Sequence, residues 1–323
     1  MVSVQAFARL HFGLLNPEGG GAGRAFGGVG LTIARPDLCL RVEPAAVWSA
    51  EGPLAERALT FAQRFQEVSC REERRDHLPP RRIRIERAMP AHLGLGSGTQ
   101  LALATARALA ESWNLNCDTP VLARRVGRGL RSALGIHGFD LGGFLVEGGK
   151  RPNDSLSPLL TRHAFPEEWR LLLALPGSSE GAMGLNGRDE IAAFARLQTG
   201  STAQARTDAL CRLVLLGMLP SLIERDLEAF GEALFEFNAR VGEAFASAQG
   251  GLYASPRIEE TVAFLRDRDH RGVGQSSWGP LVFAVVGDED RAEWTAEQLR
   301  RHFGWEPSQA WVASACNHGH RLL

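Results

Sequence analysis

Three glycines alternate with other residues at positions 94 to 98, directly before a segment rich in alanine and leucine that predicts a helix. The first amides of a helix have no intrahelical partner and lie at the positive end of the helix dipole. Glycines in front of such a helix let the backbone approach an anion closely, and hydroxyl side chains add donors. The pattern therefore predicts a cradle for phosphate or pyrophosphate. The predicted cradle comprises Gly94, Gly96, Ser97, Gly98, Thr99 and Gln100.

Two common phosphate motifs do not fit this loop. No lysine follows Gly98, so it is not a P-loop, and the glycine spacing is not that of a dinucleotide-binding fingerprint. The remaining alternative is a Gly/Ser-rich helix cap that holds no ligand. Three alternating glycines exceed what a cap requires, which favours a binding role.

A second polar group lies between a turn and a strand near the end of the chain. Glutamine and serine side chains can bind phosphate or ribose oxygens, and an indole offers a flat face to an aromatic ligand. The alternative is a polar turn above a core tryptophan. The residues are Gln275, Ser276, Ser277 and Trp278.

Three further residues are candidates for catalysis. Arg9 and His11 share one face of an N-terminal strand, where they could hold a carboxylate or phosphate or be ordinary polar groups at a strand edge. Asp140 is the carboxylate nearest to the segment 128–132 and is a candidate acid, base or charge partner. The metal ligands stay unknown, because the spacing of Cys316, His318 and the following residues matches no common zinc pattern.

The elements that must position these residues can be read from periodicity and turn signals. We expect a loop over 90–98, helices over 99–113 and 120–133, and a strand over 141–147. In the second half we expect strands near 170–175, 281–286 and 310–315, with helices near 206–222, 226–247, 256–267 and 291–303. The order predicts an α+β chain. The turn-rich run at 151–158 suggests domains at 1–158 and 159–323.

Composition excludes several classes of protein. The 323 residues are 44% apolar and 23% charged, with a net charge of -1, so the basic excess of a nucleic-acid-binding protein is missing. No stretch reaches the roughly 20 apolar residues of a membrane span. Five scattered cysteines, an odd number without a CxxC pair, favour a reducing compartment, and we expect a cytoplasmic protein.

Several segments together resemble the GHMP superfamily of small-molecule kinases. GLGSGTQLALATARAL at 94–109 is similar to its second motif and is closest to the beta-ribofuranosylaminobenzene 5'-phosphate synthase branch. ARLHFGLL at 8–15, the segments 128–132 and 142–149, and GVGQSSWGP at 272–280 resemble other motifs of that branch. The resemblance implies a two-domain GHMP-kinase-like fold, with an N-terminal mixed sheet covered by helices and a C-terminal ferredoxin-like α/β sandwich.

The branch also implies a reaction. Its members are pentosyltransferases that join phosphoribosyl pyrophosphate to 4-aminobenzoate or 4-hydroxybenzoate, with loss of pyrophosphate and carbon dioxide, on the route to methanopterin. We therefore expect small-molecule substrates and Mg²⁺ as cofactor, with neither nucleic acid nor membrane as partner, and a homodimer is compatible with this expectation.

The alternative that the same resemblance leaves open is an ATP-dependent GHMP kinase. Such kinases commonly carry an aspartate shortly after a serine in the central motif. Aligned through Ser132, this chain has Gly135 at that place. The segment 274–280 is also bulkier and more polar than the glycine-rich third motif of the kinases, and both departures count against phosphoryl transfer.

Overall fold

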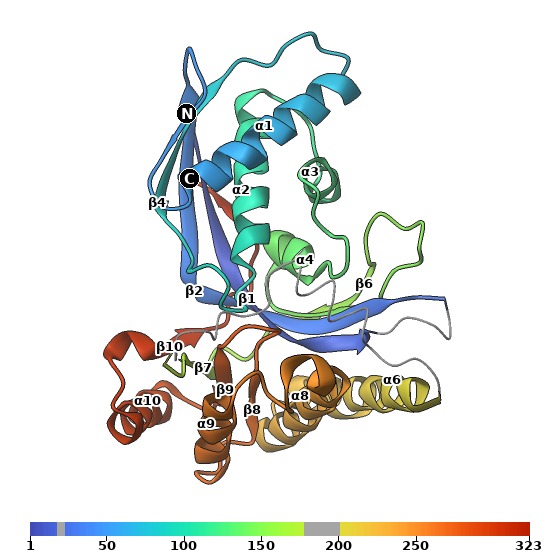
Figure 1. The fold of residues 1–323 in the computed structure, drawn as a ribbon, viewed down its shortest axis with the longest axis vertical. Coiled ribbons are helices and arrows are strands. Elements are labelled where there is room, and N and C mark those ends of the chain that lie inside the picture. Colours follow the sequence, from blue (N-terminus) through green and yellow to red (C-terminus); the bar gives the residue numbers. More distant parts are fainter. Residues whose placement is uncertain (18–22, 178–200) are drawn as a thin grey trace.

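The computed structural model describes residues 1–17, 23–177 and 201–323, which form two sheets with helices packed on them (Figure 1). The first sheet contains strands β1 (Val2–Asn16), β2 (Phe26–Pro44), β3 (Ser49–Glu51), β4 (Arg81–Arg87), β5 (Phe144–Glu147), β6 (Leu159–His163) and β11 (Arg321–Leu322). Their main order is β11-β1-β2-β4-β3, and β5 pairs with β2 and with β6. The sheet is mixed, because β3 runs parallel to β4 while the other pairs are antiparallel.

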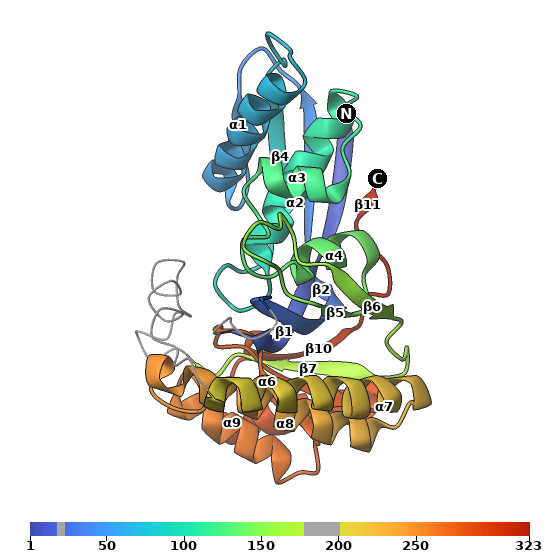
Figure 2. The ribbon, with the colours of Figure 1, turned by 90° about the vertical axis from the view of Figure 1, so that its right-hand side faces the viewer.

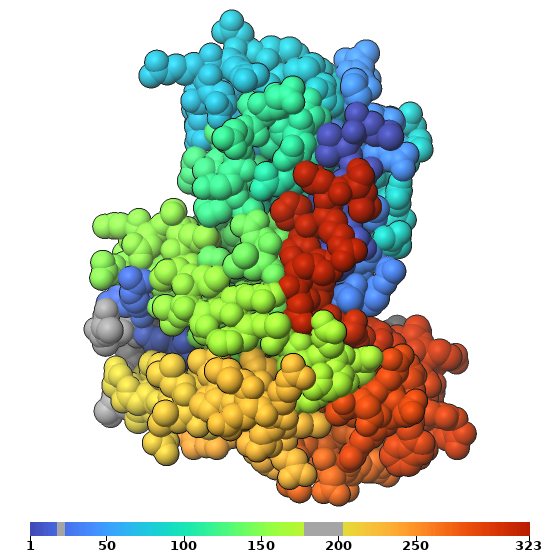
Figure 3. All heavy atoms as spheres, turned by 180° about the vertical axis from the view of Figure 1, so that it is seen from behind, coloured from blue at the N-terminus to red at the C-terminus, as the bar shows by residue number. Residues whose placement is uncertain are grey.

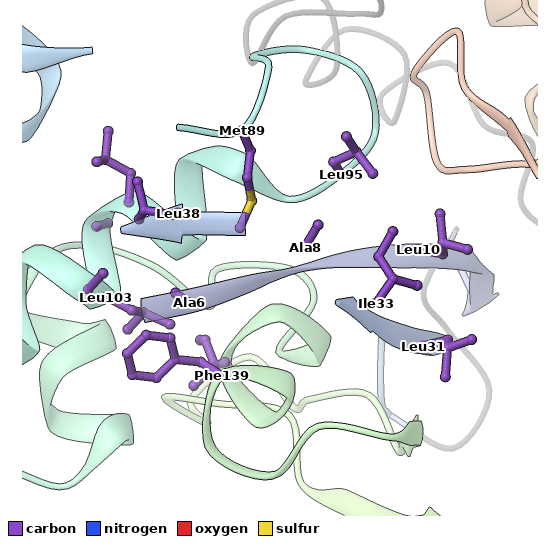
Figure 4. Packing of buried hydrophobic residues seen from close by; sticks show 14 of the residues in the cluster. Ala6, Ala8, Leu10, Leu31, Ile33, Leu38, Met89, Leu95, Leu103 and Phe139 are labelled. Carbon is purple, nitrogen blue, oxygen red and sulfur yellow. The ribbon is translucent and has the colours of Figure 1, made fainter. Parts of the chain in front are cut away.

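Helices α1 (Ala55–Glu72), α2 (Ser97–Ser112), α3 (Thr119–Arg125) and α4 (Leu134–Leu141) accompany this sheet (Figure 2). The α2 helix packs on β1 and β2, and the small alanine side chains along it allow this close approach. Figure 4 shows how Leu10 of β1 and Leu31 of β2 belong to the same buried cluster as Leu95, Leu103 and Phe139 from the loop, α2 and α4. The loop before α2 is therefore anchored in the core.

The second sheet contains β7 (Arg170–Ala174), β8 (Gly272–Gln275), β9 (Val282–Val286) and β10 (Ala310–Ser314), in the order β10-β7-β9-β8 with every pair antiparallel. Leu172 and Ala174 face helices α9 (Pro256–Arg266) and α10 (Glu289–Phe303), whereas Leu171 and Leu173 join the main core. The chain passes through this sheet as β-α-β-β-α-β, which is the ferredoxin-like arrangement. The predicted α+β fold with a mixed first sheet and a ferredoxin-like second unit is confirmed.

Between β7 and β8 the described chain is helical. Helices α6 (Ser201–Leu213) and α7 (Leu219–Glu224) are joined by a π-helical turn at Val214–Met218, and the long α8 (Leu227–Gln249) follows. Phe230, Leu234 and Phe237 of α8 are fully buried. The same helix contacts β8 and the end of β1, so it lies where the two sheets meet.

One predicted helix is wrong in extent. The helix expected over 120–133 ends at Arg125, and residues 127–132 form a loop. The cause is local, because Gly127 and Gly129 have φ angles of 69° and 84°, which a right-handed helix cannot contain. The strand expected over 141–147 also begins later, at Phe144.

The chain crosses between the two sheets more than once. Strand β6 follows residue 158 and pairs with β5 of the first sheet, and after β10 the chain returns so that Ala315 bridges Ile33 and β11 pairs with β1. Figure 3 shows the C-terminal residues in red against the first sheet and its helices. The boundary between residues 158 and 159 stays a prediction.

Candidate active site

A cavity of about 310 Å³ lies where β1, the start of α2, the loop 127–132, the C-terminal half of α8 and the β8–β9 turn meet. The elements of the first sheet and its helices, which we call the first unit, line it mainly with polar and charged groups. The elements of the second sheet and its helices, the second unit, line it mainly with apolar groups. The first group includes Arg9, His11, Thr99, Arg128, Arg131 and Ser132. The second includes Val241, Phe245, Leu252, Tyr253 and Trp278, together with the polar Asn238, Gln275 and Ser277.

The start of α2 has the geometry expected of an anion cradle. Gly96 occupies the N-cap position with a φ of 74°, and no side chain among the described residues caps the helix there. The first amides of α2 are therefore left to a ligand or to water. Thr99 lines the cavity, whereas Gln100 is buried and its Nε2 donates to the carbonyl of Gly135 at 2.8 Å. Gln100 thus ties α2 to α4, and Ser97 is the first residue of the helix.

Arg9 and His11 both line the cavity, as their shared strand face suggests. The Arg9 backbone amide donates to the Leu95 carbonyl at 3.0 Å, and its Nη1 donates to the Gly94 carbonyl at 2.9 Å. Gly94 itself has a φ of 82°, and a Cβ there would lie 2.2 Å from the Ser276 carbonyl oxygen. Strand β1, the glycine loop and the β8–β9 turn are thus held together at Gly94.

His11 continues into a buried polar chain. Its Nε2 lies 3.2 Å from Ser132 Oγ, which donates to Glu147 Oε1 at 2.6 Å, while the Ala133 amide donates to Glu147 Oε2 at 2.6 Å. Glu147 is completely buried, and this burial raises its pKa against the opposing effect of both hydrogen bonds. Burial, and then the nearby Arg9 guanidinium, hold the pKa of His11 well below its usual value, so the ring is neutral at pH 7.

The β8–β9 turn joins the two units. Ser276 Oγ donates to the Gly94 carbonyl at 2.8 Å and accepts from the His11 amide at 3.1 Å, and the Ser277 amide donates to the His11 carbonyl at 3.0 Å. Gln275 donates to the Ser277 carbonyl and accepts from the Ala254 amide. Gln275 and Ser277 line the cavity, whereas Ser276 is fully buried and holds the turn in place.

Trp278 is half-buried on the apolar wall. Its ring meets Phe245 edge to face with centroids 4.3 Å apart, and it packs with Leu14 and Val241 in a small cluster of its own. Burial raises the pKa of neighbouring Tyr253 to about 12, so its hydroxyl keeps its proton among these apolar groups. The wall can therefore accept a flat ring.

Asp140 lies elsewhere. It is exposed in the last turn of α4, accepts a hydrogen bond from Thr119 Oγ1 and does not line the cavity. No aspartate or glutamate of the described segments lines the cavity at all. The structure thus places Asp140 outside the cavity, and its catalytic role stays a prediction.

The structure adds residues that sequence reasoning did not select. Ser132 and Glu147 lie within segments that carried the family resemblance, and a lone glutamate in the apolar strand Phe144–Glu147 is itself a sign of a buried carboxyl group. Val241 and Phe245 belong to the apolar face of α8, and nothing in the sequence distinguishes them from core residues. Only their place in the fold shows that they line the cavity.

Comparison with known proteins gives a consistent family. Residues 56–148 match the family described as GHMP kinases N terminal domain, and residues 218–304 match GHMP kinases C terminal. The beta-ribofuranosylphenol 5'-phosphate synthase of Methanothermobacter thermautotrophicus is 32% identical, over 87% of this chain and 88% of that protein. The enzyme of the same name from Archaeoglobus fulgidus is 30% identical, over 94% and 93% respectively.

Solved structures agree on the fold. The homoserine kinase of Cytophaga hutchinsonii superposes with a TM-score of 0.68 at 15% identity, covering 100% of this chain and 97% of that one. None of the helices in the described part of the chain is long and apolar enough to cross a membrane. Within the same residues, no group of three or more His, Cys, Asp or Glu side chains is placed to hold a metal ion.

Proposed function

Because the chain belongs to the GHMP superfamily and, within it, to the beta-ribofuranosylphenol 5'-phosphate synthase family, we propose that it is a pentosyltransferase of the methanopterin route. It joins phosphoribosyl pyrophosphate to 4-aminobenzoate or 4-hydroxybenzoate and releases pyrophosphate and carbon dioxide. The observation that carries the substrate assignment is the cavity, which sets arginines and Thr99 of the first turn of α2 opposite an aromatic wall.

In the proposed reaction every bond that forms is matched by one that breaks, and neither an oxidant nor an added base is needed. The bond between ribose C1 and pyrophosphate breaks, and its electron pair leaves on the pyrophosphate. The ring carbon that bears the carboxylate attacks C1 and forms the new C–C bond. The bond to the carboxylate then breaks, its electron pair restores the aromatic ring, and carbon dioxide departs.

The described residues suit these demands. The negative charge that grows on pyrophosphate meets the first amides of α2 and the Arg128 guanidinium, which are fixed before the reaction begins. The cationic ribosyl group must be kept from water, and Phe245, Tyr253 and Trp278 supply the apolar surface that excludes it. His11 is neutral and therefore adds no positive charge beside that cation.

The expected Mg²⁺ fits the substrate better than the protein. Magnesium favours oxygen ligands and commonly binds through one or two carboxylates together with substrate phosphates. The cavity wall formed by the described residues offers no carboxylate. The described lining therefore does not fit a protein-bound Mg²⁺, and in our proposal the chain itself would neutralise the diphosphate through arginines and amides.

The ATP-dependent kinase is the second candidate, and the fold allows it. However, Gly135 stands where such kinases carry an aspartate, and its carbonyl is occupied by Gln100. In addition, Trp278 stands in a segment where kinases of this superfamily carry a glycine-rich run, and its ring packs on Phe245.

The test is to incubate the protein with phosphoribosyl pyrophosphate, Mg²⁺ and carboxyl-labelled 4-aminobenzoate or 4-hydroxybenzoate, and to count released carbon dioxide. ATP with homoserine, mevalonate or a sugar is the control. Release of label supports the synthase, whereas turnover of ATP without any release of label would replace it with the kinase.

A further inference from the structure

Two arginines from distant parts of the chain lie beside the first turn of α2, and a third lies against the loop that follows α3. Arg57, Phe61 and Arg64 lie at helical spacing on one face of α1, and Arg128 follows α3. A Cβ on Gly98 would lie 2.5 Å from Arg57 Nη2 and 3.6 Å from Arg128 Nη2. The Arg57 guanidinium therefore approaches the helix start more closely than a side chain at residue 98 would allow, and the Arg128 guanidinium lies at van der Waals distance from the same point.

The third arginine completes the cluster. A Cβ on Gly127 would lie 2.6 Å from Arg64 Nη2, so the Arg64 guanidinium rests against the backbone next to Arg128. The Phe61 ring is shared, since Arg128 Cζ lies 4.9 Å and Arg57 Cζ 5.9 Å from its centroid. An aromatic ring can hold guanidinium groups in place without neutralising them.

In the described part of the chain, no carboxylate forms an ion pair with these three guanidinium groups. Within residues 1–17, 23–177 and 201–323, none of the three guanidinium groups forms an ion pair or a hydrogen bond, and Arg128 Nε is a buried donor without an acceptor. Burial, and then repulsion from Arg57 and Arg64, lower the pKa of Arg128. Elsewhere on the same helices the arginines are paired, as Arg125 is with Glu72 and Glu73. Arg64 is exposed and Arg57 and Arg128 are half-buried, so an anion placed among them would offset both the repulsion and the desolvation of Arg128.

From this geometry we propose that Arg57, Arg64 and Arg128 form, with the first amides of α2, a binding site for a diphosphate group. Arg128 and Thr99 line the cavity, so the site opens onto the space beside Arg9 and His11. A diphosphate carries more negative charge than a single phosphate ester, and paired guanidinium forks match its oxygens. The identification of this group as the pyrophosphate of the pentosyl donor rests on the proposed function.

Calorimetric titration with inorganic pyrophosphate and, separately, with ribose 5-phosphate tests the site. We expect Arg57→Gln and Arg128→Gln each to weaken pyrophosphate binding by about tenfold or more, because each removes a charge-assisted hydrogen bond. Gly98→Ala should weaken it as well, since the added methyl group displaces Arg57. Ribose 5-phosphate affinity should change by less than about twofold.

Arg71→Gln is the matched control, because Arg71 lies on the same helix but is exposed and pairs with Glu67. It should bind pyrophosphate like the wild type. Arg128→Lys retains a charge without the planar fork and should lose an intermediate amount of affinity. Melting curves verify that each variant is folded. If Arg128→Gln does not fold, Arg128→Lys takes its place in the titration.

The outcomes separate the two proposals. Unchanged pyrophosphate affinity in folded Arg57 and Arg128 variants would overturn the site, and so would a loss confined to ribose 5-phosphate. If the wild type releases carbon dioxide from the labelled acid in that case, the proposed function survives. Arginine-dependent pyrophosphate binding by a protein that releases no carbon dioxide would support the site and remove the synthase.

Discussion

The two walls of the cavity differ in chemistry and in how they are built. The wall formed by β1, α2 and the loop 127–132 is mainly polar, and some of its side chains are hydrogen-bonded to backbone groups or to one another, as Arg9 is to Gly94 and His11 to Ser132. The wall formed by α8 and the β8–β9 turn is mainly apolar, and Phe245 and Trp278 are held by ring packing. The first arrangement suits a charged ligand whose groups need fixed partners, and the second suits a flat ring that needs surface.

Under the proposed function, this difference lets one cavity receive two unlike substrates, without a carboxylate in its described lining. Ligand binding at the polar wall should be sensitive to the loss of a single hydrogen-bond donor. The wall made of packing should tolerate change better, because dispersion contacts are individually small.

The largest effect should follow from a change in the glycine loop. Gly96 has a φ of 74°, and a Cβ there would lie 3.0 Å from Arg9 Cγ. Gly96→Val should therefore distort the cradle and lower the rate of carbon dioxide release by about 100- to 1,000-fold, the usual result of losing a preorganised donor. Ser97→Ala, which removes one hydroxyl and leaves the backbone intact, should lose less. An unchanged rate in the valine variant would contradict the cradle.

The next effect concerns the polar chain behind His11. Ser132→Ala removes one donor to the buried Glu147 carboxyl group and should cost about 1–3 kcal/mol in the free energy of unfolding. Adding Glu147→Gln should recover part of the loss, because an amide is less costly to bury than a carboxylate. Urea unfolding of the single and double variants measures the coupling. Strictly additive losses would mean that the two side chains do not act together.

A smaller effect is expected on the aromatic wall. Trp278→Ala should raise the KM for the aromatic acid by about 2- to 12-fold, the range set by 0.5–1.5 kcal/mol of ring contact, and change the KM for phosphoribosyl pyrophosphate much less. Trp294→Ala, at an exposed tryptophan of α10, is the control. A large fall in melting temperature with normal affinity for the acid would instead make Trp278 a core residue.

The smallest effect is a dependence of stability on pH. The pKa of folded His11 lies well below 6.5, so below pH 6.5 the unfolded chain binds a proton there that the folded chain does not. This contribution is complete above pH 6.5 and is lost as the pH falls. His11→Gln should therefore flatten the decline in stability between about pH 6.5 and 5. An equally steep decline in the variant would show that other groups cause it.

Local patterns predicted the parts of the site that are local. The glycine loop, the start of α2 and the shared strand face of Arg9 and His11 all follow from spacings of a few residues. The helix predicted over 120–133 rested on the same kind of local pattern, but its extent was wrong. There the positive φ angles of Gly127 and Gly129 outweigh the helix formers around them.

Long-range convergence could not be read from spacing. Arg57 and Arg128 meet because α1 and the loop after α3 both pack near α2, and neither position is distinctive along the sequence. Glu147 becomes a site residue only because β5 pairs with β2 and brings it beneath Ser132. Asp140, chosen for its closeness in sequence, lies on an exposed helix end instead.

The most direct test of the account is the stoichiometry of a single reaction. Carbon dioxide, pyrophosphate and the riboside phosphate should be measured together, with phosphoribosyl pyrophosphate and carboxyl-labelled 4-hydroxybenzoate or 4-aminobenzoate as substrates. A synthase should release equal amounts of all three and should not depend on ATP. Pyrophosphate release without carbon dioxide, or turnover that requires ATP, would contradict it.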